Sequence, residues 1–175
     1  MRKEICISGF GGQGVGLAGQ IVGQAAAIFD GKEAVMTQAY GPEARGGASS
    51  ANIVISESSI AYPFVQSPDV LITLSQEAYT KFRPTAKNGA LILIDSGLVT
   101  PLDEDSPLKI PATQLAENLG NRIVTNLVML GFFTAVSNIL TRSAMEQAIK
   151  SSIKARFIEL NLKAFDRGFK YALEK

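Results

Sequence analysis

A glycine cluster near the start of the chain, Gly9-Phe10-Gly11-Gly12-Gln13-Gly14, has the residue types and spacing best suited to chemistry. It follows the apolar run Ile5–Ser8 and precedes a helical pattern that begins at Val15, so it joins a predicted buried strand to a predicted helix. The spacing G-x-G-x-x-G is typical of loops that bind phosphate, because glycine lets a ligand approach the backbone and the helix start offers unpaired N–H groups. We therefore expect a phosphate site here. The alternative is a tight turn with a purely structural role.

This glycine loop could also belong to a site for a nicotinamide or flavin dinucleotide. Such a site requires an acidic residue about 20 positions further on, at the end of the second strand, to bind a ribose hydroxyl. The corresponding stretch, Val35–Gln38, contains no carboxylate, and both Asp30 and Glu33 come too early in the chain. The dinucleotide hypothesis is weakened by this departure but stays open.

A second loop, Tyr40-Gly41-Pro42-Glu43-Ala44-Arg45-Gly46-Gly47, follows the predicted second strand. In a parallel α/β sheet the loops after the strands meet at the carboxyl edge, so both loops are expected at one crevice. Arg45 could bind a phosphate in bidentate fashion, and Gly46 and Gly47 would let the backbone turn beside it. The alternative is a surface loop with a solvated arginine.

Composition excludes several classes of function. The net charge is +1, from 17 basic and 16 acidic residues, which does not suggest a nucleic-acid or membrane partner. Cys6 is the one cysteine and histidine is absent, so a disulfide framework and cysteine-built iron–sulfur or zinc sites are excluded for this chain. We assign no catalytic and no metal-binding residue. The charged start Met1–Glu4 is unlike a signal peptide, and the apolar run Leu127–Val136 is too short to span a membrane, so we expect a cytoplasmic protein.

Strand and helix patterns alternate along the chain. They predict an α/β fold, a three-layer α/β/α Rossmann-like domain with a largely parallel sheet and a helical C-terminal part, formed by residues 1–175 as a single domain. The expected strands are Ile5–Ser8, Glu33–Tyr40, Ala51–Ser56, Val70–Leu74, Ala90–Asp95 and Leu108–Pro111, with a short edge piece within Ser58–Pro63. The expected helices are Val15–Phe29, Gln76 to about Arg83, Ala112–Leu119 and, with breaks, Ile123 to the end, including a capping box at Ser143–Glu146.

The two loops together resemble the gamma subunit of 2-oxoacid:ferredoxin oxidoreductases. The resemblance also rests on four further stretches, Ala61-Tyr62-Pro63, Ser67–Ile72, Thr125–Gly131 and Glu159–Phe165. It covers essentially the whole chain, and the Tyr-Gly-Pro-Glu form before Arg-Gly-Gly is closer to the 2-oxoglutarate and general 2-oxoacid branch than to the indolepyruvate branch.

The resemblance implies a subunit that is not catalytic alone. It would contribute coenzyme A binding and assembly to a thiamine diphosphate-dependent complex, which converts a 2-oxoacid, 2-oxoglutarate or a related acid, into an acyl-coenzyme A and reduces ferredoxin. Thiamine diphosphate and the iron–sulfur clusters would lie on alpha, beta and delta-type partner subunits. The implied coenzyme A residues are Gly11, Gly12, Gln13, Gly14, Val15, Arg45, Gly46 and Gly47.

Two alternatives remain beside this interpretation. One is a free-standing dinucleotide-binding oxidoreductase, and the other is an assembly module whose glycine loops bind no ligand. Two segments carry more apolar helix surface than one sheet face needs, namely Thr125–Leu140 and the stripe Ile158, Leu162, Phe165 and Phe169. We expect part of this surface, or the edge with the glycine loop, to be buried against other subunits, and the isolated chain to self-associate to cover it.

Overall fold

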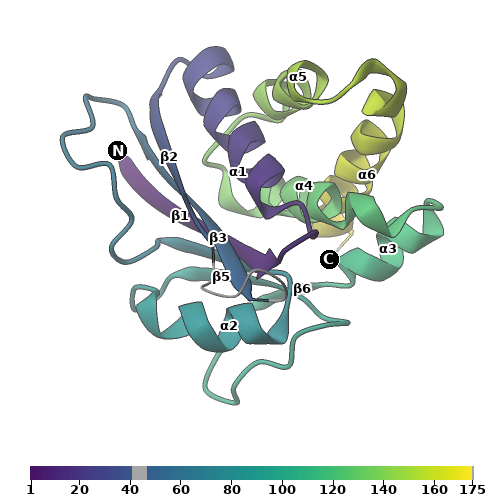
Figure 1. The fold of residues 1–175 in the computed structure, drawn as a ribbon, viewed down its shortest axis with the longest axis horizontal. Helices are drawn as coiled ribbons and strands as arrows, with labels where there is room; N and C mark the ends of the chain where they lie inside the picture. The colour runs from purple at the N-terminus through teal and green to yellow at the C-terminus, as the bar shows by residue number, and fades with distance from the viewer. Residues whose placement is uncertain (41–46, 175) are drawn as a thin grey trace.

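The computed structural model describes residues 1–40 and 47–174. Its centre is a sheet in which the described residues form six strands, in the spatial order β2-β3-β1-β4-β5-β6 (Figure 1). The strands are β1 (Arg2–Phe10), β2 (Glu33–Ala39), β3 (Ala48–Ser56), β4 (Val70–Thr73), β5 (Leu91–Asp95) and β6 (Leu108–Ile110). The predicted edge strand within Ser58–Pro63 is wrong, because that stretch forms bends and irregular backbone.

Strand direction is uniform except for β3. The pairs β1–β4, β4–β5 and β5–β6 are parallel, whereas β3 runs antiparallel to both of its neighbours, β1 and β2. Five of the six described strands therefore point the same way, and the predicted largely parallel sheet is confirmed. The exception follows from chain length, since residues 40–47 are too few for the crossover of a dozen or more residues that parallel neighbours need.

Helices cover both faces of the sheet, which confirms the predicted α/β fold class (Figure 1). One face packs against the larger helical layer, and the other carries α2, whose buried Tyr79 packs with Ile94 and Val99. The helices are α1 (Val15–Gln24), the π-helical turn η1 (Ala25–Phe29), α2 (Gln76–Phe82), η2 (Arg83–Thr85), α3 (Ala112–Asn118), η3 (Arg122–Val124), α4 (Thr125–Ser137), α5 (Arg142–Ser152) and α6 (Ala155–Leu173). No helix among the described residues is long and apolar enough to cross a membrane.

Helices α4 and α6 are in direct backbone contact. A Cβ atom built on Gly131 of α4 would lie 1.9 Å from the carbonyl oxygen of Phe165, and one built on Gly168 of α6 would lie 1.8 Å from that of Val128. Glycine at both positions is what lets the helices approach so closely. Phe165 is fully buried and Leu162 packs on the same core, so part of this apolar stripe is used within the chain, and burial of the rest against other subunits or by self-association stays a prediction.

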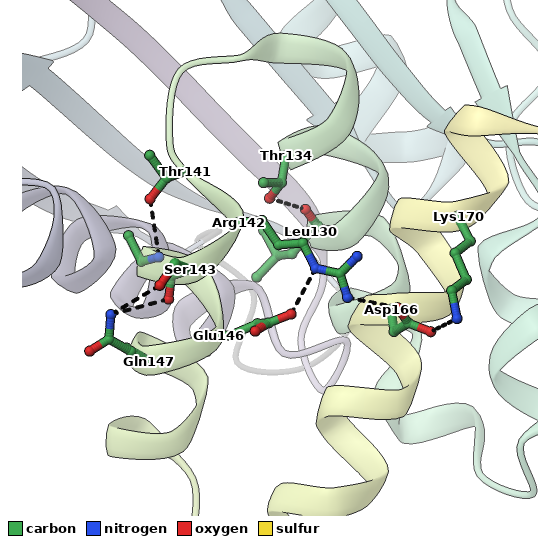
Figure 2. A network of polar contacts seen from close by, with 10 residues as sticks. Leu130, Thr134, Thr141, Arg142, Ser143, Glu146, Gln147, Asp166 and Lys170 are labelled. Carbon is green, nitrogen blue, oxygen red and sulfur yellow. Dashed lines mark hydrogen bonds and ion pairs between the residues drawn. The ribbon is translucent and has the colours of Figure 1, made fainter.

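The start of α5 is fixed by polar contacts to other parts of the chain. The Thr141 hydroxyl accepts from the Ala144 backbone N–H at 3.1 Å and donates to Asp30 at 2.7 Å. Thr141 is therefore the N-cap, and the predicted capping box at Ser143–Glu146 is wrong. Arg142 follows it and binds both Glu146 and Asp166 at 2.8 Å, which ties α5 to α6 (Figure 2).

Candidate functional site

A cavity of about 700 Å³ opens beside the glycine loop at the carboxyl end of β1. This volume lies within the range of small-molecule sites. The lining residues come from the glycine loop, the first turn of α1, the residue after β2, the start of β3, the η3–α4 junction, the α5–α6 connection and the first turns of α6. They are Phe10, Gly11, Gly12, Gly14, Val15, Gly16, Leu17, Tyr40, Ser49, Asn121, Ile123, Val124, Asn126, Ser152, Ile153, Lys154, Phe157, Leu160 and Asn161.

The backbone of the glycine loop is left-handed at two of its glycines, one of which, Gly14, belongs to the G-x-G-x-x-G spacing. Gly12 and Gly14 have φ angles of 92° and 72°, in the left-handed region that favours glycine. Gly14 is the N-cap of α1, and among the described residues no side chain caps that helix. The first N–H groups of α1 are therefore left for another partner, and the residues that carry them, Val15 to Leu17, line the cavity.

Gln13 holds the loop together instead of facing the cavity. Its side-chain oxygen accepts from the Phe10 backbone N–H at 2.7 Å, and its side-chain nitrogen donates to the Leu74 carbonyl at 2.8 Å. Both ends of the amide are thus used within the protein, joining the loop to the end of β4. Gln13 is not among the residues that line the cavity, and its predicted contact with a ligand stays a prediction.

Asn126, in the first turn of α4, positions the start of α1 by direct contact. Its side-chain nitrogen donates to the Gly14 carbonyl at 3.1 Å, and the residue is only 3% exposed. A Cβ atom on Gly14 would lie 2.3 Å from this nitrogen, so Gly14 is glycine for close packing as well as for its φ angle. Sequence analysis gave Asn126 no role, because the contact joins residues 112 positions apart.

The predicted site residues divide into three groups. Gly11, Gly12, Gly14 and Val15 line the cavity, whereas Gln13 and Gly47 are not among its lining residues, and the predicted ligand contacts of all six stay predictions. Arg45 and Gly46 lie outside the described residues, so their predicted contact with a phosphate stays a prediction.

The side of the cavity facing the loop is mostly apolar and was missed by sequence analysis. Ile123 is 69% exposed and Phe157 is 44% exposed, so two large apolar side chains are open to solvent at this side of the cavity. Lys154 lies at the same side, just before α6. These residues come from the last third of the chain, and no local motif marks them.

The described lining carries little that could act as an acid or a base. Of these residues only Tyr40 and Lys154 have titratable side chains, and none is a carboxylate. The buried carboxylate Asp95 lies elsewhere, where it accepts hydrogen bonds from Thr113 and Gly97. The arrangement suits binding of an anionic ligand with an apolar portion, and it offers no general acid–base pair.

Comparison with known proteins decides the family. The family model described as pyruvate ferredoxin/flavodoxin oxidoreductase matches residues 4–171. The chain belongs to this family. Its relatives within the family include the 2-oxoglutarate synthase subunit KorC of Methanocaldococcus jannaschii, which is 49% identical over 179 residues, covering 99% of this chain and 96% of that protein.

Solved structures of the family share the fold. The keto/oxoacid ferredoxin oxidoreductase gamma subunit from Geobacter sulfurreducens PCA is 41% identical, with a TM-score of 0.89 and coverage of 99% of this chain and 98% of that one. The 2-oxoglutarate:ferredoxin oxidoreductase of Magnetococcus marinus, solved with 2-oxoglutarate, coenzyme A and succinyl-CoA bound, has a TM-score of 0.88. At 23% identity, covering 99% of this chain and 31% of that one, it shows the likeness of fold alone. The predicted recognition as a gamma-type subunit is confirmed.

Proposed function

We propose that this chain binds coenzyme A as the gamma subunit of a 2-oxoacid:ferredoxin oxidoreductase complex. The observation that carries the proposal is the cavity in which the uncapped start of α1 and the glycine loop face an apolar side. Coenzyme A combines phosphate groups with a long, largely uncharged arm, so it has the two kinds of surface that this cavity offers. The missing ribose-binding carboxylate at Val35–Gln38 favours coenzyme A over a dinucleotide.

In this proposal the chain binds and orients coenzyme A, and the oxidative step belongs to its partners. The α1 start holds phosphate through its backbone N–H groups, while Gln13 and Asn126 keep the loop and the helix in place. Thiamine diphosphate and the iron–sulfur clusters lie on alpha, beta and delta-type subunits, and ferredoxin accepts the electrons. The 2-oxoacid is 2-oxoglutarate or a related acid. Residues 1–175 act as one domain, and the complex works in the cytoplasm. Arg45, with Gly46 and Gly47, closes over the ligand or becomes ordered at the subunit interface.

Gly11 provides the sharpest test of the phosphate site. It has an ordinary φ angle, and a Cβ atom there would meet no described atom within 4 Å, so a side chain can be added without strain. Gly11→Asp adds a negative charge beside the α1 start, and Gly11→Asn adds a neutral side chain of nearly the same shape. Gly14 is unsuitable for this purpose, because any side chain there would meet Asn126.

The two variants are compared in the complex formed with the partner chains. We expect Gly11→Asp to raise the Michaelis constant for coenzyme A by roughly ten-fold or more relative to Gly11→Asn, because a like charge repels the phosphate. The constant for the 2-oxoacid is expected to stay the same. Equal constants for coenzyme A in the two variants would contradict the proposal and would favour an assembly module without a ligand.

A further inference from the structure

Lys154 has an unusual place at the cavity. It is the N-cap residue of the 19-residue helix α6, where the helix dipole is positive and a cation is unfavourable. Among the described residues no side chain caps this helix, and its first turn contains no acidic residue. The start of α6 therefore combines the Lys154 ammonium group with the positive end of the helix dipole, and of its first N–H groups the one of Phe157 donates to the Lys154 carbonyl at 2.9 Å.

Other cations of α6 do have partners on the same helix. Lys163 binds Glu159 at 2.7 Å, and Lys170 binds Asp166 at 2.7 Å. For Lys154, no ion pair or hydrogen bond from its side chain occurs within residues 1–40 and 47–174. Its ammonium group is the one cation that the described lining of the cavity contains.

The cavity thus has two positive regions on different walls. One is the α1 start beside the glycine loop, and the other is Lys154 with the start of α6. Apolar side chains, including Ile123 and Phe157, occupy the same lining. A ligand with one charged group would use only one of these regions. A ligand with two separate phosphate groups would use both and would cover the exposed apolar side chains.

We infer that Lys154 binds the 3′-phosphate of coenzyme A, while the α1 start binds the pyrophosphate. This assignment rests on the proposed function and makes Lys154 the residue that distinguishes coenzyme A from its dephosphorylated form. The 3′-phosphate is a monoester that carries close to two negative charges at neutral pH, so it gains most from a compact ammonium group. The pyrophosphate, with its charge spread over two groups, fits the row of backbone N–H groups in the glycine loop.

The test uses equilibrium binding of coenzyme A and dephospho-coenzyme A to the assembled complex. Lys154→Gln removes the charge, Lys154→Arg keeps it, and Lys163→Gln makes the same charge change on α6 away from the cavity. We expect Lys154→Gln to weaken coenzyme A by roughly ten-fold or more and to leave dephospho-coenzyme A unchanged. Lys154→Arg should retain most of the affinity, and Lys163→Gln should match the unmodified complex.

Three results would overturn the assignment. Equal weakening of both ligands by Lys154→Gln would place the ammonium group on the pyrophosphate. An equal effect of Lys163→Gln would mean that only the overall charge matters. No effect on either ligand would remove Lys154 from the site. In each case Gly11→Asp still tests the proposed function separately, since a loss of coenzyme A binding in that variant supports the site whatever Lys154 does.

Discussion

The backbone contact between α4 and α6 predicts that Gly131→Ala destabilises the protein. The new Cβ atom would lie 1.9 Å from the Phe165 carbonyl oxygen and 2.8 Å from the Phe169 backbone nitrogen. Closest C···O contacts in proteins are about 3.3 Å, so the two helices would have to separate by roughly 1.4 Å. Neither neighbour is a flexible side chain that could move aside. Overpacking of this kind costs about 1–3 kcal/mol and sometimes more, against a gain of about 1 kcal/mol in helix propensity.

The same substitution at Gly23 of α1 is a matched control. A Cβ atom there meets no described atom within 4 Å, so Gly23→Ala should gain about 0.5–1 kcal/mol from the lower entropy of the unfolded chain. In a chain of this size 1 kcal/mol shifts the midpoint of thermal unfolding by about 2–4 °C, so a net loss of about 2 kcal/mol in Gly131→Ala should lower the midpoint by roughly 4–8 °C, and Gly23→Ala should raise it by about 1–4 °C.

Urea unfolding of the two variants, followed by circular dichroism, gives the free energies directly. A Gly131→Ala protein as stable as the unmodified chain would refute the close approach of the helices. The double variant Gly131→Ala, Gly168→Ala gives a second check. Once one alanine has separated the helices the second finds more room, so the combined loss should be smaller than the sum of the single losses.

Three further predictions concern polar and titratable groups. Gln13→Ala removes two hydrogen bonds and should lower the free energy of unfolding by about 1–3 kcal/mol while weakening coenzyme A, as titration of the complex would measure. Burial alone would raise the pKa of Glu4, but hydrogen bonds from Arg2 and from two backbone N–H groups lower this pKa below its ordinary value of 4.5. The ionised Glu4 side chain therefore stabilises the folded chain above pH 4.5, and this stabilisation is lost as the pH falls through the lowered pKa. Glu4→Gln should therefore flatten the loss of stability in acid, measured by urea unfolding between pH 3 and 6, roughly the range in which such carboxyl groups titrate. Burial raises the pKa of Cys6 to about 12, so alkylation at neutral pH should follow the rate of unfolding, and rapid alkylation of the folded chain would contradict its burial.

The features predicted correctly are those with a local cause. Apolar runs and glycine stops placed most strand boundaries within three residues. The G-x-G-x-x-G spacing allowed positive φ angles at Gly9, Gly11 and Gly14, and of these Gly14 has one whereas Gly9 and Gly11 do not. The start of β3 was placed at Ala51 but lies at Ala48, because this polar end of the strand pairs with Gly9 and Phe10 of β1. That pairing depends on a neighbour about 40 positions away, which no local pattern reveals.

The features that were missed depend on contacts between distant parts of the chain. Asn126 matters because α4 ends up beside Gly14, and Thr141 is the N-cap because Asp30 binds its hydroxyl. A local capping pattern two residues further on was overridden by that tertiary contact. Lys154 resembles any surface lysine in the sequence, and it gains significance only where the fold brings the start of α6 opposite the start of α1.

The α4–α6 contact also has a consequence for the cavity. Asn126 at the start of α4 lines it, and so do Lys154 and Phe157 at the start of α6, so the distance between these two helices sets the position of one wall relative to the other. Separating them by roughly 1.4 Å to relieve the Gly131→Ala contact moves Lys154 away from any ligand held at the α1 start. Gly131→Ala should therefore weaken coenzyme A even at temperatures where the variant is fully folded, whereas Gly23→Ala should leave the affinity unchanged. A destabilised Gly131→Ala complex with normal coenzyme A binding would mean that the ligand does not span both walls.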